Sequence, residues 1–97
     1  MKLIYTNHLK IRLKQREVPL KIVSEIFDKS EESYWDNLRN HHIVIGTVDF
    51  KGKIRKVLAA YDTIKKDAEV ITIHPISDIE IKQRLISERW SYEKSKS

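Results

Sequence analysis

Hydrophobic residues follow helical spacing at both ends of the chain and strand-like alternation in its middle. Leu9 and Leu13 lie four apart, and apolar residues recur at the same spacing between Pro19 and residue 29, which predicts two short helices. Pro19 ends the first helix and suits the first turn of the second. We therefore expect a bent pair of helices at the start of the domain.

The middle of the chain predicts an antiparallel meander of three or four strands. Its apolar residues are mostly Ile and Val, and Gly52 lies in a short hairpin turn where a positive φ is needed. Residues 1–5 are a short strand or a lead-in, and residues 30–33 are a polar linker. The expected strands cover residues 34–38, 41–50, 54–62 and 69–74.

The last helix has clear start signals. Ser77 and Glu80 have the spacing of a capping box, and Ile76 and Ile81 flank them as a hydrophobic staple. Ile79, Ile86 and Trp90, with Leu85 beside them, form the predicted apolar line of this helix. We expect one α+β domain over residues 1–92 and a charged tail over residues 93–97.

Composition narrows the class of protein. The 97 residues are 40% hydrophobic and 34% charged, as in a globular domain, and no run approaches the roughly 20 apolar residues of a membrane span. There is no cysteine, so disulfides and thiolate metal sites are excluded, and a cytoplasmic setting fits. The net charge of +5 indicates an anionic partner, nucleic acid or an acidic protein segment, or a lysine-rich solvated surface.

His8, Arg12 and Arg16 are spaced four apart and spread over about 80° of the first helix. A histidine that exchanges a proton beside two fixed cations suits phosphodiester cleavage: the histidine is acid or base, and the arginines hold the phosphate. The alternative is a half-exposed helix whose arginines pair with carboxylates.

The most strand-like run, Val70 to Pro75, ends in a polar side chain. Simple alternation predicts Ile71 and Ile73 on one side, with Val70, Thr72 and His74 on the other. His74 is then a second titrating group or a phosphate donor, with Thr72 beside it. Alternatively, it hydrogen-bonds a helix terminus.

Further cations follow the hairpin and lie on the last helix. Arg55 and Lys56 should face opposite sides, and Arg84 and Arg89 accompany Trp90. Arginine beside an aromatic ring can grip unstacked RNA bases, although Trp90 also suits a core position. We take these four cations and Thr72 as candidate substrate-binding residues.

The pair His41-His42 does not predict a metal site. Neighbours in a strand point to opposite faces, so both rings cannot chelate one ion, and no carboxylate cluster or HExxH motif accompanies them. We expect no metal and no cofactor.

Several motifs together resemble a known family. They are His8-x3-Arg12-x3-Arg16, Gly52 to Arg55, Ala59 to Tyr61, Ile71 to Ile76, Arg84, and Glu88 to Trp90. The chain, from about residue 7 to 90, is similar to a family of small uncharacterised bacterial and archaeal domains. That family is grouped with RelE-type toxins in the barnase–EndoU–colicin–RelE ribonuclease fold.

The resemblance implies two N-terminal helices packed on a curved, RelE-like antiparallel sheet of three to four strands, with a C-terminal helix after it. It also implies metal-independent RNA cleavage through the ribose 2′-hydroxyl and a neutralising antitoxin. His8, Arg12, Arg16 and His74 would line the cleft, with one histidine as general base and the other as general acid. Two other hypotheses stay open: a non-catalytic module that binds RNA or an acidic protein, and a homodimeric interaction domain.

Overall fold

The computed structural model describes residues 2–93 and contains three helices and six strands in one sheet. The elements in chain order are β1 (Leu3–Tyr5), α1 (Asn7–Gln15), α2 (Lys21–Asp28), β2 (Ser30–Asp36), β3 (His41–Phe50), β4 (Lys53–Ile64), β5 (Asp67–Pro75), α3 (Asp78–Ile86) and β6 (Trp90–Tyr92).

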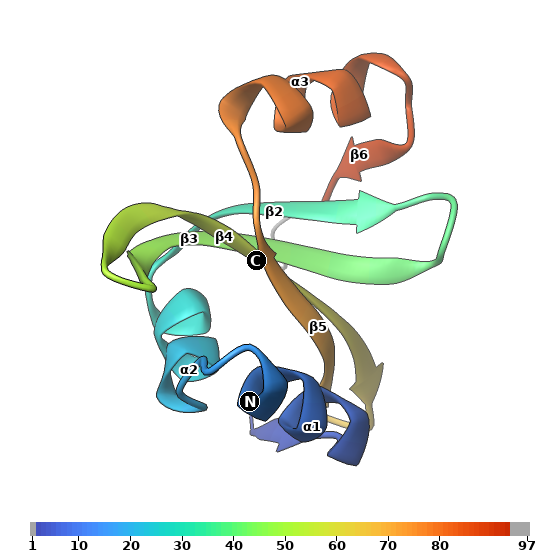
Figure 1. Cartoon of the computed structure of the whole chain (residues 1–97). Helices are drawn as coiled ribbons and strands as arrows, with labels where there is room; N and C mark the ends of the chain where they lie inside the picture. Colours follow the sequence, from blue (N-terminus) through green and yellow to red (C-terminus); the bar gives the residue numbers. More distant parts are fainter. Residues whose placement is uncertain (1, 94–97) are drawn as a thin grey trace.

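The sheet is built around the long β3–β4 hairpin, with strand order β1-β5-β4-β3-β2-β6 (Figure 1). Strand β1 lies parallel to β5, and the other neighbours are antiparallel. The hairpin pairs Phe50 with Lys53 at the turn and His42 with Tyr61 near its far end. The long hairpin thus fixes which side chains of the two strands lie opposite each other.

The helices cover both faces of the sheet: α1 and α2 lie on one, and α3 lies on the other (Figure 1). Each face has its own core, since alternate residues of a strand point to opposite sides. On the α1/α2 face, Leu9, Leu13, Val23 and Ile26 pack against the sheet. On the α3 face, Ile81 packs beside the stacked rings of Tyr34 and Trp90 and the sheet residues under them, so the expected core position of Trp90 is confirmed.

The predicted RelE-like arrangement of two N-terminal helices on an antiparallel meander of three to four strands is wrong. The sheet has six strands and is mixed, because β1 precedes the helices and adds in parallel to the β5 edge. Strands β1 and β6 have three residues each, too few to show alternation. Residues 30–33 are the start of β2 and not a linker; their mostly exposed polar side chains hid the strand.

The predicted side-chain alternation in β5 is also wrong at Val70, which does not share a face with Thr72 and His74. Val70 and Ile73 both lie in the core under α1 and α2, whereas Thr72 and His74 point to the α3 face. A register shift explains this: Tyr61 pairs with Val70 while the next partner, Ala60, pairs with Thr72, which leaves Ile71 as an extra residue. The bulge therefore places Val70 and Ile73 in the same core.

The predicted start of α3 is confirmed, whereas the predicted apolar face of this helix is wrong. Ser77 and Glu80 form the capping box, and Ile76 and Ile81 are both buried. Ile79 and Ile86, however, are 70% and 72% exposed, so the predicted line through Ile79, Ile86 and Trp90 is wrong. Trp90 follows the helix as the first residue of β6, and its direction is set by pairing with β2 instead of by helical spacing.

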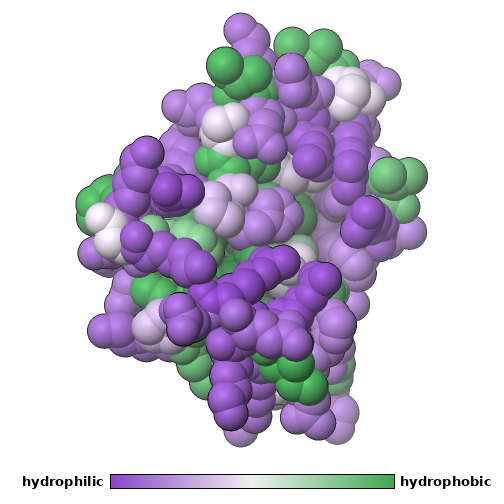
Figure 2. Space-filling model, in the orientation of Figure 1, coloured by the Kyte–Doolittle hydropathy of each residue, from purple (hydrophilic) through white to green (hydrophobic). Residues whose placement is uncertain are grey.

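Polar side chains cover most of the surface seen in Figure 2, with hydrophobic residues visible between them. Among the residues that the structure describes, none of the helices is long and apolar enough to cross a membrane. Of the predicted charged tail, only Glu93 is described, where it pairs with His42, and residues 94–97 lie outside the described part.

Candidate functional site

A small cavity of about 100 Å³ opens on the α3 face of the sheet. Its floor consists of sheet residues that are mostly apolar, and Trp90 is part of its wall. Around this floor stand charged and polar side chains from four parts of the chain. They are Asp36, Arg39, His41, Thr72, His74, Arg84 and Arg89.

Four of the residues predicted to act on a substrate, Thr72, His74, Arg84 and Arg89, line this one cavity. The first two come from β5 beyond its bulge, and the others come from the end of α3 and the turn after it. Arg84 lies over the Trp90 ring, 5.5 Å from the guanidinium carbon to the ring centroid. Cations, a histidine and a hydroxyl thus surround an apolar floor.

The side chain of His74 is exposed, yet its surroundings favour the neutral imidazole over the imidazolium. Partial burial of the imidazole, followed by the positive charge of Arg84, lowers the pKa of His74; Arg16 adds to this effect and Glu80 opposes it. The neutral imidazole is therefore the favoured form at neutral pH. A neutral imidazole can accept a proton, which is the property that a general base requires.

Asp36 is the buried acid at the edge of the cavity, with its side chain only 5% exposed. Its carboxylate accepts hydrogen bonds from the Leu38 and Arg39 amides, at 2.9 and 3.1 Å, and lies 3.5 Å from Arg89 Nη2. Burial raises the pKa of Asp36, but these hydrogen bonds and the Arg89 charge outweigh it, and the net pKa is lowered. Asp36 thus orders the turn that carries Arg39 and positions Arg89.

Replacing Asp36 by alanine is expected to lower the free energy of unfolding by about 1–3 kcal/mol at pH 7, because two amides and a guanidinium lose their partner. Since the folded-state pKa is lowered, this stabilisation is present above the unfolded-state pKa of about 3.9 and is lost as the pH falls further. Urea unfolding at pH 7 and pH 3 checks this. The exposed Asp49→Ala is the control, and an equal loss for Asp36→Ala at both pH values would contradict it.

The three candidate residues predicted on α1 do not line this cavity. His8, Arg12 and Arg16 are exposed on the helix surface, while Leu9 and Leu13 are buried beneath it as predicted. Near the start of α1, Thr6 Oγ1 donates to the Val70 carbonyl, and Arg16 at its end acts on His74. The helix packs against β5, and His8 lies about 12 Å along the helix axis from Arg16.

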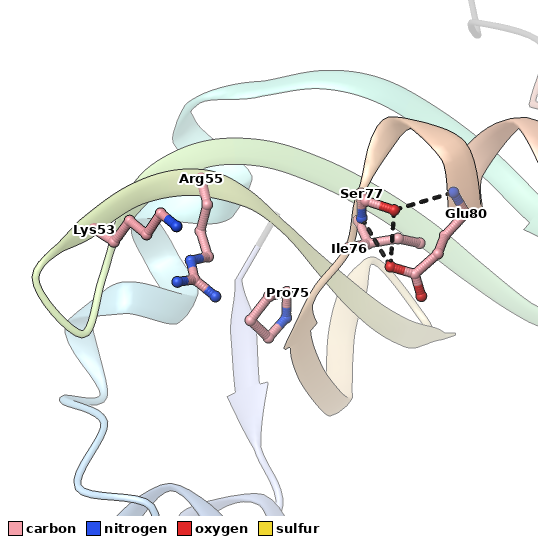
Figure 3. Close-up of a pocket in the computed structure, with 6 residues that line it drawn as sticks. All are labelled: Lys53, Arg55, Pro75, Ile76, Ser77 and Glu80. Atoms are coloured by element: carbon pink, nitrogen blue, oxygen red, sulfur yellow. Dashed lines mark hydrogen bonds between the residues drawn. The ribbon is translucent and has the colours of Figure 1, made fainter.

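Arg55 and Lys56 lie on opposite faces of β4, away from the cavity. Lys56 Nζ bridges Glu32 and Asp78, at 2.9 and 2.8 Å, and these hydrogen bonds raise the Lys56 pKa. Arg55 lines a second, open pocket whose residues are drawn in Figure 3; there its guanidinium points toward Pro75, and the capping box closes the other side. Lys56 thus ties β2, β4 and α3 together, and Arg55 is a cation separate from the cavity.

His41 and His42 point to opposite faces, as the strand pattern predicts. His41 lines the cavity and pairs with Asp62, whereas His42 contacts Glu93 on the other face. The sequence motifs do not point to a catalytic or binding role for His41, Asp62, Asp36 or Arg39. The hairpin contains the missing signal, because counting outward from its turn places residue 41 opposite residue 62.

Within residues 2–93, no group of three or more His, Asp or Glu side chains is arranged to hold a metal ion. Of the described residues that line the cavity, one is a carboxylate, Asp36, and it is already bonded to two amides and Arg89. The arginines of the cavity can bind an anion, and its histidines can exchange protons with a bound ligand.

Comparisons of the chain with protein-family models, with curated proteins and with solved structures found no match. Function must therefore be inferred from the geometry of the cavity and from the motifs that resemble those of RelE-type toxins.

Proposed function

We propose that the protein is a metal-independent endoribonuclease of the toxin type and that the cavity on the α3 face is its active site. The observation that carries the proposal is the cavity itself, in which two histidines and three arginines surround an apolar floor. Phosphodiester cleavage through the 2′-hydroxyl needs those groups: a base, an acid and cations that stabilise charge on the phosphate.

In this mechanism neutral His74 takes the proton from the ribose 2′-hydroxyl. The 2′-oxygen attacks phosphorus, the bond from phosphorus to the 5′-oxygen breaks, and a protonated group opposite His74 supplies a proton to the leaving 5′-oxygen. The products are a 2′,3′-cyclic phosphate and a free 5′-hydroxyl. Arg84 and Arg89 hold the phosphate, and Thr72 donates a hydrogen bond to it.

The apolar floor suits a nucleobase, because a base that has left its stack buries its ring against such a surface. The substrate is therefore single-stranded RNA. The motif resemblance to RelE-type toxins supports a cytoplasmic toxin that is neutralised by a small antitoxin protein.

The test is incubation of the purified protein with a fluorescent single-stranded RNA of mixed sequence in EDTA. We expect cleavage of the RNA and no cleavage of the same sequence with 2′-O-methyl riboses, since the nucleophile is then blocked. Salt-sensitive binding of RNA without any products would instead favour a non-catalytic RNA-binding module. Cleavage of the methylated strand at an equal rate would rule out the 2′-hydroxyl mechanism.

A further inference from the structure

His41 is the first residue of β3 and is held by a carboxylate from the neighbouring strand. Its Nδ1 lies 2.7 Å from Asp62 Oδ1, with the imidazole 26% exposed. An ionised carboxylate can only accept a hydrogen bond, so Nδ1 must be the donor. Nε2 is then the ring nitrogen left to exchange a proton with a ligand in the cavity that His41 lines.

His41 and His74 lie diagonally across the cavity floor. In the sheet, Ile43, Ala60 and Thr72 form one row of paired residues; His41 lies on one side of this row, and His74 lies on the other beside Leu58. The two histidines are thus two strands apart with an apolar row between them. The other charged groups that line this space are Asp36, Arg39, Arg84 and Arg89, and Asp62 is paired with His41.

We propose that His41, positioned by Asp62, is the general acid that works opposite His74. The inference rests on the proposed function, and it puts His41 in place of His8 as the histidine that works with His74; the motif pattern left open which histidine of the pair is the acid. The proton moves from Nε2 of the His41 imidazolium to the leaving 5′-oxygen as the phosphorus–oxygen bond breaks. Asp62 remains a carboxylate throughout: it holds the tautomer and stabilises the imidazolium.

A second histidine–carboxylate pair, His42 with Glu93, serves as a matched control on the opposite face. The His42 ring stacks on Tyr61 and meets the edge of Trp35, each 5.0 Å between centroids. Its Nδ1 contacts Glu93 and its Nε2 lies 2.9 Å from Thr63 Oγ1, so both ring nitrogens have partners. This pair is structural and should not affect cleavage.

The experiment measures kcat/KM for cleavage of the mixed-sequence RNA in EDTA between pH 4.5 and 9. His41→Ala is expected to lose about 10²–10⁴-fold, and added imidazole should restore part of the rate. Asp62→Asn should lose up to about 10⁴-fold and move the alkaline fall in activity to lower pH, because the amide stabilises the imidazolium less. Glu93→Gln should keep the wild-type rate and pH profile.

The outcomes separate the two proposals. If wild type cleaves RNA and folded His41→Ala keeps its rate and pH profile, the acid role of His41 is overturned while the proposed function stands. If wild type produces no cleavage, both proposals fail together. Should His41→Ala unfold, His41→Gln replaces it; a folded His41→Gln with wild-type activity again overturns the role. An equal loss for Glu93→Gln would also overturn it, since the effect would then be structural.

Discussion

Replacing His74 by alanine is expected to lower the rate of RNA cleavage about 10²–10⁴-fold, because the variant lacks the group that takes the proton from the 2′-hydroxyl. The fold should survive, since His74 is exposed and lies in a strand paired along its length. Initial rates of cleavage in EDTA, compared at equal protein concentration, measure the effect. Wild-type activity in a folded His74→Ala variant would contradict the assignment.

The pH dependence of RNA cleavage tests the role of His74 as the base in a second way. Because the pKa of His74 is lowered, the base is already neutral below the ordinary histidine range near 6.5, and activity should persist to correspondingly lower pH. Arg84→Gln removes a positive charge that disfavours the imidazolium. The acidic limb of kcat/KM should therefore move to higher pH, and Arg16→Gln should move it in the same direction by less. A limb that stays in place in both variants would show that His74 does not control it.

The second large effect concerns stability and arises where α2 packs on β3. A Cβ atom added at Gly46 would lie 2.6 Å from the Ile26 carbonyl oxygen and 3.2 Å from its Cα, both of them backbone atoms of α2. Gly46→Ala must therefore push the helix away from the sheet and disturb the buried residues between them. We expect a loss of about 1–3 kcal/mol, typical of overpacking, with a melting temperature lower by several degrees.

Gly52→Asn is the control for this substitution. Gly52 has φ +80° in the hairpin turn, and an added Cβ would meet nothing within 4 Å. Asparagine tolerates the left-handed region, so this variant should differ little from wild type in a thermal melt. A Gly46→Ala variant as stable as Gly52→Asn would mean that α2 does not press on β3 in this way.

Local signals predicted much of the fold. The capping box at Ser77, the buried residues Leu9 and Leu13, and the turn at Gly52 depend on neighbouring residues, and the structure has each of them. The two outer strands depend on distant partners. Tyr5 pairs with Val70 and Trp90 with Asp36, and three-residue strands leave too little periodicity to be recognised.

The candidate site was predictable in part. Thr72 and His74 keep their shared face because the bulge at Ile71 precedes both of them. His41 and Asp62 lie at matching distances from the hairpin turn, so strand register alone could have paired them. The path of α1 was not accessible from spacing, because packing against β5 sets it, and this path leaves His8, Arg12 and Arg16 outside the lining of the cavity.

The chemistry of the cleaved ends tests the central claim most directly. Mass spectrometry of the products formed from single-stranded RNA in EDTA should find 2′,3′-cyclic phosphates and 5′-hydroxyls, because the 2′-oxygen is the nucleophile and the cavity works without a metal. Products that carry 5′-phosphates and 3′-hydroxyls, or an RNA that stays intact, would contradict the account.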